Sequence, residues 1–192
     1  MQQNYNLCFH KSFIMKILLT IIGILAILII LVLIIALYSK RDYTVQREIV
    51  INQPVDKVFD YVRHLKNQDY FNKWVMRDPD MKKSFRGTDG TVGFVYGWDG
   101  NKQAGAGEQE IMSIDPNKQI GIVIRFERPF KAIAQAPITV EAVTTNQTRI
   151  RWRMSSSMKY PMNAMMLFAD MDRLLGKDLQ WSLEKLKGIL EK

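Results

Sequence analysis

The side chains that could carry out acid/base chemistry are few. Glu108 and Glu110 stand two residues apart in a segment of strand character, so they share one strand face and could form a carboxylate pair. Tyr96 is the third candidate, provided that it lies inside a cavity with a shifted pKa. Charges on a strand more often face water and pair with basic neighbours such as Arg125, which is the interpretation we favour. Gln109 would then point inward as a polar anchor.

The sequence lacks the residues that redox, metal-assisted or nucleophilic reactions require. The single cysteine, Cys8, cannot form an internal disulfide, and no group of His and Cys has the spacing of metal ligands. His64 falls near the end of an expected helix, where a solvated surface role is expected. The serines at 155–157 have no histidine or acid placed to activate them and are typical of a turn. We therefore expect no metal, no cofactor and, on balance, no enzyme.

Composition limits the class of partner. The chain has 192 residues, of which 47% are hydrophobic and 24% charged, with a formal net charge of +8. This length fits one ordinary globular domain with an additional segment. The positive charge is spread out, and no run of Lys and Arg alternates with aromatic residues, so nucleic acid is not an expected partner.

The additional segment is an apolar run near the N-terminus. Residues Ile17 to Leu37 are almost wholly Ile, Leu, Val and Ala, and as a helix they would measure roughly 30 Å, the thickness of the hydrocarbon core of a bilayer. We expect a single transmembrane helix at 17–38, between an N-terminal tail at 1–16 and a tether at 39–42. A cleaved signal peptide is the alternative, but the run is too long and no small-x-small site precedes Ser39.

The side of the membrane is less strongly indicated. Lys11 and Lys16 precede the apolar run, whereas Lys40, Arg41 and Arg47 follow it. The positive-inside rule places the flank with more basic residues in the cytoplasm. Three basic residues follow the run and two precede it, so the count slightly favours a cytoplasmic domain. The opposite orientation stays open.

After the tether, the pattern predicts one strand, two short helices and then a series of strands. The first strand covers 43–51, and Pro54 opens a helix whose apolar face includes Val58 and Phe59. A second short helix is expected at 68–75. Turn residues then separate further strands, as in an antiparallel meander. These strands are expected at 91–98, 107–114, 119–127, 131–143 and 148–155.

The last stretch, Pro161 to Lys192, predicts a long amphipathic helix. Its apolar residues recur at steps of three and four, which places them on one helix face. They are Ala164, Phe168, Met171, Leu175, Leu179, Leu183, Leu186 and Leu190. A curved antiparallel sheet is the surface available to cover so long a stripe. The predicted fold is therefore an α+β domain over residues 43–192, in which a sheet wraps around the C-terminal helix.

This order of elements resembles the START-related superfamily of lipid-transfer and polyketide cyclase proteins (SRPBCC), which has the helix-grip fold. The residues that carry the resemblance are Ile49-x-x-x-x-Pro54-x-x-x-Val58-Phe59, Trp74, Ser113-Ile114-Asp115-Pro116, Phe126-x-x-Pro129 and Gly176-Lys177-Asp178-Leu179-x-x-x-Leu183-x-x-Leu186-Lys187. The resemblance covers residues 43–192. It implies a cavity between sheet and helix for a hydrophobic small molecule, in a superfamily that contains both binders and enzymes.

Alternation along the strands indicates which side chains would face that cavity. Large residues on some strands and alanines on others could leave a void beside the helix, although a filled core would give the same pattern. The candidate lining residues are Phe94, Tyr96, Trp98, Gln109, Ile111, Ile124, Phe126, Ala134, Ala136, Trp152, Met154, Met165 and Phe168.

The functional hypothesis is that the domain binds a hydrophobic small molecule or a lipid at a membrane. Six of the 11 methionines lie between Met154 and Met171, where flexible side chains could form a cavity mouth that faces the bilayer. Two alternatives remain: a cyclase-like enzyme that uses Glu108, Glu110 or Tyr96, and a protein-interaction domain with a filled core. The sequence predicts neither the ligand nor the oligomeric state.

Overall fold

A computed structural model describes residues 2–192, with side chains described from Met15 onward. The chain divides into two compact units. The helical unit contains the residues up to Lys40 together with residues 159–168. The sheet domain contains residues 41–158 and 169–192. Each unit is described here by itself.

The helical unit consists of α1 (Gln2–Tyr38) and the 3-10 helix η3 (Met162–Leu167). Within α1, Met15–Tyr38 has a mean hydropathy of 3.5 and is long and apolar enough to cross a membrane by length and composition. Most of its large apolar side chains are exposed. Residues 2–16, expected as part of a tail, continue the helix, whereas the tail's first residue lies outside the described residues.

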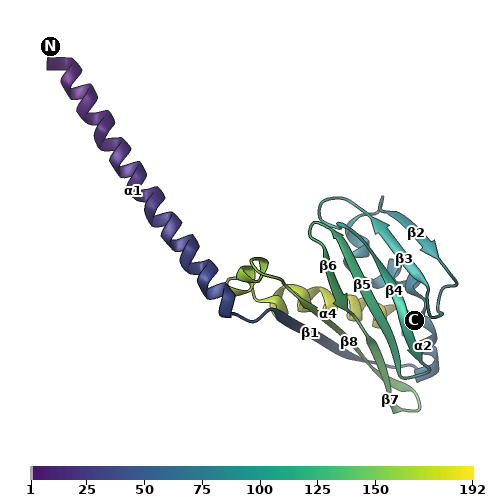
Figure 1. Cartoon of the computed structure of the whole chain (residues 1–192). Coiled ribbons are helices and arrows are strands. Elements are labelled where there is room, and N and C mark those ends of the chain that lie inside the picture. Colours follow the sequence, from purple (N-terminus) through teal and green to yellow (C-terminus); the bar gives the residue numbers. More distant parts are fainter. Residues whose placement is uncertain (1) are drawn as a thin grey trace. The chain divides into compact units, whose positions relative to one another are not determined.

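The sheet domain contains one antiparallel sheet of eight strands, visible in Figure 1. The strands follow the order β1-β8-β6-β5-β4-β3-β2, and β7 pairs with both β5 and β8. Their bounds are β1 (Asp42–Ile51), β2 (Lys82–Arg86), β3 (Val95–Asp99), β4 (Ala106–Asp115), β5 (Gln119–Arg128), β6 (Ala132–Gln135), β7 (Ile138–Thr144) and β8 (Gln147–Ser157). The α+β fold class is confirmed.

Helices occupy the start and the end of the sheet domain. After β1 come α2 (Val55–Arg63), η1 (Leu65–Asn67), α3 (Gln68–Phe71) and η2 (Val75–Arg77), and the domain ends with α4 (Met171–Leu190). The predicted apolar stripe of α4 supplies Leu179, Leu183 and Leu186 to the core, where they are fully buried. They belong to one cluster with Val45 of β1 and Ile150 of β8. Each such side chain contributes roughly 1.5–3 kcal/mol by leaving water.

The C-terminal helix begins ten residues later than predicted. Asp170 is its N-cap, and the Asp170 carboxylate accepts a hydrogen bond from the Arg173 backbone N–H at 3.1 Å. A short acidic side chain in this position satisfies a free N–H group at the helix end, which fixes the start at Met171. The expected helix over 161–170 is therefore wrong. Ala164 lies in η3, and Phe168 immediately follows it.

Two strand predictions also need correction. The strand expected at 131–143 is two strands, β6 and β7, because Pro137 has no N–H to donate to a ladder. The strand expected at 91–98 begins only at Val95, because the residues before it form a turn in which Gly93 has a φ of 85°. Likewise, the helix expected at 68–75 divides into α3 and η2.

Candidate functional site

A cavity of about 240 Å³ lies in the sheet domain between the strands and the first turns of α4. Aromatic and aliphatic side chains form most of its wall. The lining residues are Tyr43, Asn72, Trp74, Val75, Met81, Tyr96, Trp98, Gln103, Ala104, Gln109, Ile124, Phe126, Arg128, Pro129, Met154, Met171 and Leu175. They come from five strands, from the turns around η2 and β3, and from α4.

The register of three neighbouring strands brings much of the lining together. Tyr96 of β3 pairs with Gln109 of β4, which in turn pairs with Ile124 of β5. Residues directly opposite one another on an antiparallel ladder point to the same face. Alternation within each strand therefore carries these three side chains to the cavity side of the sheet.

One glycine makes room for the aromatic part of the wall. Gly107 stands between Trp98 and Phe126 on the ladder, and a Cβ at this position would come within 2.9 Å of the Trp98 ring. Without a side chain there, the two rings meet edge to face with centroids 5.9 Å apart. Gly107 thus lets two aromatic rings from strands that are not neighbours form one surface.

A cluster of neutral amides supplies the polar part of the cavity. Gln109 and Asn72 line it and are almost wholly buried, as is Gln68 behind them. The Gln68 side-chain oxygen accepts hydrogen bonds from Asn72 Nδ2 at 2.7 Å and from Gln109 Nε2 at 3.3 Å. Gln68 Nε2 is buried and has no partner among the described residues. The cluster can therefore offer hydrogen bonds without carrying charge.

Tyr96 forms part of the wall, but its hydroxyl is already engaged. It donates a hydrogen bond of 2.6 Å to Asp69 Oδ1, and Asp69 Oδ2 forms an ion pair of 2.8 Å with Lys83 Nζ. Burial, together with the Asp69 carboxylate, raises the pKa of Tyr96 far above its ordinary value. Tyr96 is thus a neutral hydrogen-bond donor in this fold and is unsuited to act as a base near neutral pH.

The two glutamates lie on the other face of β4. Arg125 Nη1 forms ion pairs with Glu108 at 3.2 Å and with Glu110 at 2.7 Å, and Arg86 contacts Glu108 at 3.0 Å. These carboxylates do not line the cavity. The outward ion pairs and the inward Gln109 agree with the interpretation favoured from the sequence.

The predicted lining residues fall into three groups. Tyr96, Trp98, Gln109, Ile124, Phe126 and Met154 line the cavity. Phe94, Ile111, Ala134, Ala136 and Trp152 are buried in the core and are not among the lining residues. Met165 and Phe168 belong to the helical unit and are exposed. A role in ligand binding remains a prediction for every one of them.

Sequence reasoning missed other parts of the wall. Leu175 and Met171 lie four residues apart on the predicted apolar face of α4, so their spacing carried a usable signal. Tyr43 pairs with Ser156 at the end of the first ladder. Asn72 is a polar residue directly after Phe71, and it is the C-cap of the short helix α3. The sequence had no signal that separates such a residue from an ordinary surface asparagine.

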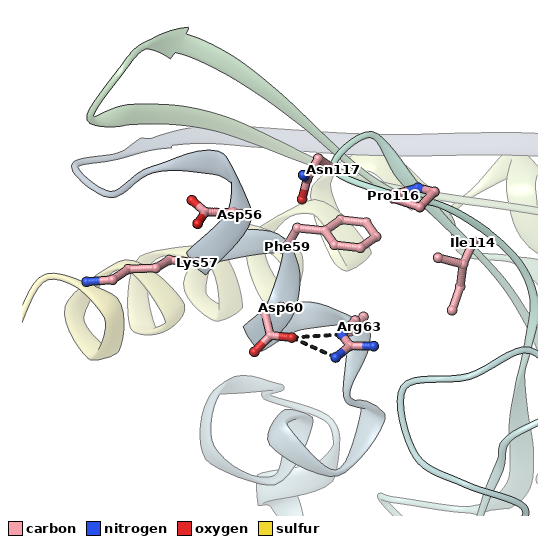
Figure 2. A pocket seen from close by; sticks show the side chains of 8 residues that line it. All are labelled: Asp56, Lys57, Phe59, Asp60, Arg63, Ile114, Pro116 and Asn117. Atoms are coloured by element: carbon pink, nitrogen blue, oxygen red, sulfur yellow. Dashed lines mark hydrogen bonds and ion pairs between the residues drawn. The ribbon is translucent and has the colours of Figure 1, made fainter.

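A second hollow, wider and shallower, lies on the surface of the sheet domain. It measures about 540 Å³ and lies between α2 and the turn that joins β4 to β5. Figure 2 shows the Phe59 ring and Ile114 in this hollow, with Asp60 and Arg63 joined by an ion pair at its edge. Its mixed charges and open form distinguish it from the apolar cavity.

Known proteins share this architecture. Solved structures similar to the chain include a truncated norcoclaurine synthase from Thalictrum flavum, which is 10% identical with a TM-score of 0.62 over 79% of this chain and 94% of that one. Protein CV1439 from Chromobacterium violaceum is 12% identical, with a TM-score of 0.56 over 78% and 97%. Protein Mll3558 from Rhizobium loti is 16% identical, with a TM-score of 0.56 over 78% and 98%. At these identities the likeness shows the fold alone.

Comparison with curated proteins finds no match. A family model described as polyketide cyclase / dehydrase and lipid transport matches residues 42–191, which is nearly the whole sheet domain with its connection to α4. The match and the fold agree with the resemblance stated from the sequence. The chain therefore belongs to the polyketide cyclase/dehydrase and lipid transport family, within the SRPBCC superfamily of helix-grip proteins.

Proposed function

We propose that the protein binds a small hydrophobic molecule, or the apolar end of a lipid, in the cavity beside α4 while α1 holds it in a membrane. The observation that carries this proposal is the lining of the cavity. Aromatic, aliphatic and methionine side chains dominate it, with neutral amides at three positions. Such a mixture is typical of sites that take an apolar ligand and orient it with a few polar contacts.

The size of the cavity limits the ligand. Its volume of about 240 Å³ is just below the roughly 300–1,000 Å³ of ordinary small-molecule pockets. The ligand is therefore a compact ring system or short chain, or one end of a longer amphiphile. Three long, adaptable side chains in the wall, Met81, Met154 and Met171, suit ligands of varied outline.

The amides define the polar part of the ligand. Asn72 and Gln109 line the cavity as uncharged groups, so a carbonyl or hydroxyl group fits them better than an ion. Arg128 is the one charged residue in the described lining, and it pairs with Asp99 in a half-exposed position. A lipid with a carbonyl-bearing ring, such as a quinone or isoprenoid ketone, matches these features.

Binding is better supported than cyclase-like catalysis. Among the described residues that line the cavity there is neither a carboxylate nor a histidine, and Tyr96 is a neutral donor bound to Asp69. General acid/base catalysis requires a group that exchanges a proton near the working pH. A filled-core interaction domain is also less favoured, because the core leaves this space open.

The test is native mass spectrometry of the full chain purified from membranes in detergent. We expect a small hydrophobic molecule or lipid to copurify. In Leu175→Trp, an indole would fill the cavity and weaken ligand affinity by about tenfold, the equivalent of roughly 1.4 kcal/mol, which lowers the occupancy.

The matched control is Leu174→Trp, since Leu174 is the next residue of the same helix and is exposed. This variant should retain the ligand, and circular dichroism should show that both variants fold. Copurification of no ligand with the unchanged chain, or equal occupancy in the two variants, would refute the proposal.

A further inference from the structure

The helical unit brings two distant segments into contact. Residues 159–168, which include η3, pack against the C-terminal end of α1. Asn163 is fully buried there, and its Nδ2 donates a 2.6 Å hydrogen bond to the Ala36 carbonyl oxygen. The last four carbonyl groups of a helix lack partners within the helix, so this bond satisfies one of them.

On the α1 side of this contact, the buried residue is Ala36. Among the described side chains of α1, it alone is buried, whereas most of the long apolar side chains before it are exposed. A small side chain allows the second backbone to approach closely. η3 is therefore held at a defined height on α1, close to its C-terminal end.

That height can be related to a bilayer. The apolar stretch Met15–Tyr38 has 24 residues and so measures about 36 Å as a helix, a little more than the roughly 30 Å of a hydrocarbon core. Ala36 is two residues before the end of that stretch. A segment bonded to Ala36 consequently lies at the boundary between hydrocarbon and headgroups.

The outer surface of residues 159–168 suits that boundary. Phe168 is 78% exposed, and Tyr160, Met165 and Leu167 are also exposed although they are large and apolar. Tyr38, at the end of α1, is 88% exposed. Tyrosine is enriched where membranes meet water, because its ring is apolar and its hydroxyl is polar.

The charge of the helical unit also favours a position at the membrane surface. Lys40 and Lys159 flank the contact, and neither residues 1–40 nor residues 159–168 contain an aspartate or glutamate. Basic residues beside an apolar surface are attracted to anionic lipid headgroups. Water alone would be an unfavourable environment for so many neighbouring apolar side chains.

We infer that residues 159–168 form a second, interfacial membrane contact, held against the end of α1 by Asn163. Phe168, Leu167, Met165 and Tyr160 insert into the boundary of the same bilayer that α1 spans. This inference rests on the proposed membrane span. The segment would extend roughly 5–10 Å into the headgroup region, as interfacial helices do.

The test uses spin labels on the full chain in vesicles of phosphatidylcholine with phosphatidylglycerol. Cys8 is the only cysteine and is first replaced by serine, so that one new cysteine carries the label in each variant. The sites are Phe168→Cys for the interfacial segment, Leu28→Cys for the span and Met112→Cys for an exposed residue of β4. Collision with oxygen, which dissolves in lipid, is compared with collision with a polar nickel complex.

We expect a graded result. The label at residue 28 should meet oxygen far more often than nickel, that at 168 should fall between, and that at 112 should meet nickel most. If the label at 28 lies in lipid while those at 168 and 112 are equally aqueous, the inference is wrong and the span stands. If the label at 28 is also aqueous, the proposed anchor fails together with the inference.

The role of Asn163 has its own variant. Asn163→Ala removes the hydrogen bond to Ala36, so the label at 168 should become more mobile and several-fold more accessible to nickel. The label at 28 should not change, which shows that α1 is still inserted. An unchanged label at 168 would overturn the holding role of Asn163.

Discussion

Gly176 of α4 lies at a close approach to the side chain of Arg47 on β1. A Cβ atom at this position would overlap the guanidinium group of Arg47. Arg47 in turn forms two hydrogen bonds of 2.8 Å with the two carboxylate oxygens of Asp172, one turn earlier on α4. This hydrogen-bonded ion pair raises the pKa of Arg47 and lowers the pKa of Asp172. The glycine therefore provides the space for a bidentate ion pair between helix and strand.

We predict that Gly176→Leu destabilises the sheet domain, because its side chain must displace the Arg47 guanidinium group and break its ion pair with Asp172. The expected loss is about 1–3 kcal/mol, typical of an overpacked position. Thermal unfolding of the full chain in detergent, followed by circular dichroism, measures it as a lowered Tm.

Gly188 provides the control on the same helix. It is exposed, and a Cβ there would meet nothing within 4 Å. Gly188→Ala should therefore stabilise by about 0.5–1 kcal/mol through helix propensity alone. An unchanged or raised Tm for Gly176→Leu would contradict the close approach.

Single residues were predictable from sequence where one strand's alternation decides their direction. Side chains alternate between the two faces of a strand, and burying a charge is costly. These two facts predict that the side chain of Gln109 points inward and that those of Glu108 and Glu110 point outward. Trp152 shows the limit of that reasoning. Alternation places it on the inner face, but packing against Phe71 and Trp74 decides that it fills the core and does not line the cavity.

Among the elements, η2 is joined to α4 by one buried carboxylate. Asp178 lies on α4 and pairs with Lys73 at 2.7 Å and with Arg77 at 2.6 Å. The carboxylate is nearly buried, whereas its two partners are more than a third exposed. Ser182, one turn later, accepts a hydrogen bond from the Lys73 backbone N–H at 3.0 Å.

We predict that Asp178→Ala destabilises the domain by about 1–3 kcal/mol, because it leaves two cations without a partner in a half-buried place. It should also weaken ligand retention, since Trp74 and Val75 of the same segment line the cavity. Chemical denaturation gives the stability, and native mass spectrometry gives the occupancy.

The control is Asp60→Asn, which removes an exposed ion pair with Arg63 on α2. This substitution should change the free energy of unfolding by no more than about 0.5 kcal/mol. If Asp178→Ala changes stability no more than this control does, α4 is not held to η2 through the carboxylate.

Elements were predictable where periodicity is long and uninterrupted. The stripe from Leu175 to Leu190 lies on one helix, as predicted, and β8 lies within a few residues of its expected bounds. The errors fall at junctions. Met162–Leu167 has a composition that permits a helix, and only the cap at Asp170 shows that α4 begins later.

At the scale of the whole molecule, the fold was predictable but the shape of the cavity was not. The order of elements identifies a helix-grip domain, which the family match over residues 42–191 supports. The cavity depends on small spaces left between side chains such as Trp98, Phe126 and Leu175. A difference of one methyl group in the packing changes the size of such a space, and the periodicity of the sequence does not predict that size.

Membrane attachment gives the last prediction. We expect α1 to remain uncleaved and to hold the chain as an integral, single-pass protein with the sheet domain on the cytoplasmic side. The physical reasons are the 24-residue apolar stretch and the basic residues Lys40, Arg41 and Arg47 that follow it. Alkaline carbonate should leave the full-length chain in the membrane fraction, because it removes only peripheral proteins.

Protease treatment of right-side-out spheroplasts then determines the side. The sheet domain should survive in intact spheroplasts, as a cytoplasmic control protein does, and should be digested once the cells are opened. Digestion of the domain in intact spheroplasts would place it outside the cytoplasm and reverse the orientation. Release of the full-length chain by carbonate would instead remove the anchor, and with it the reason for seeking the ligand among membrane lipids.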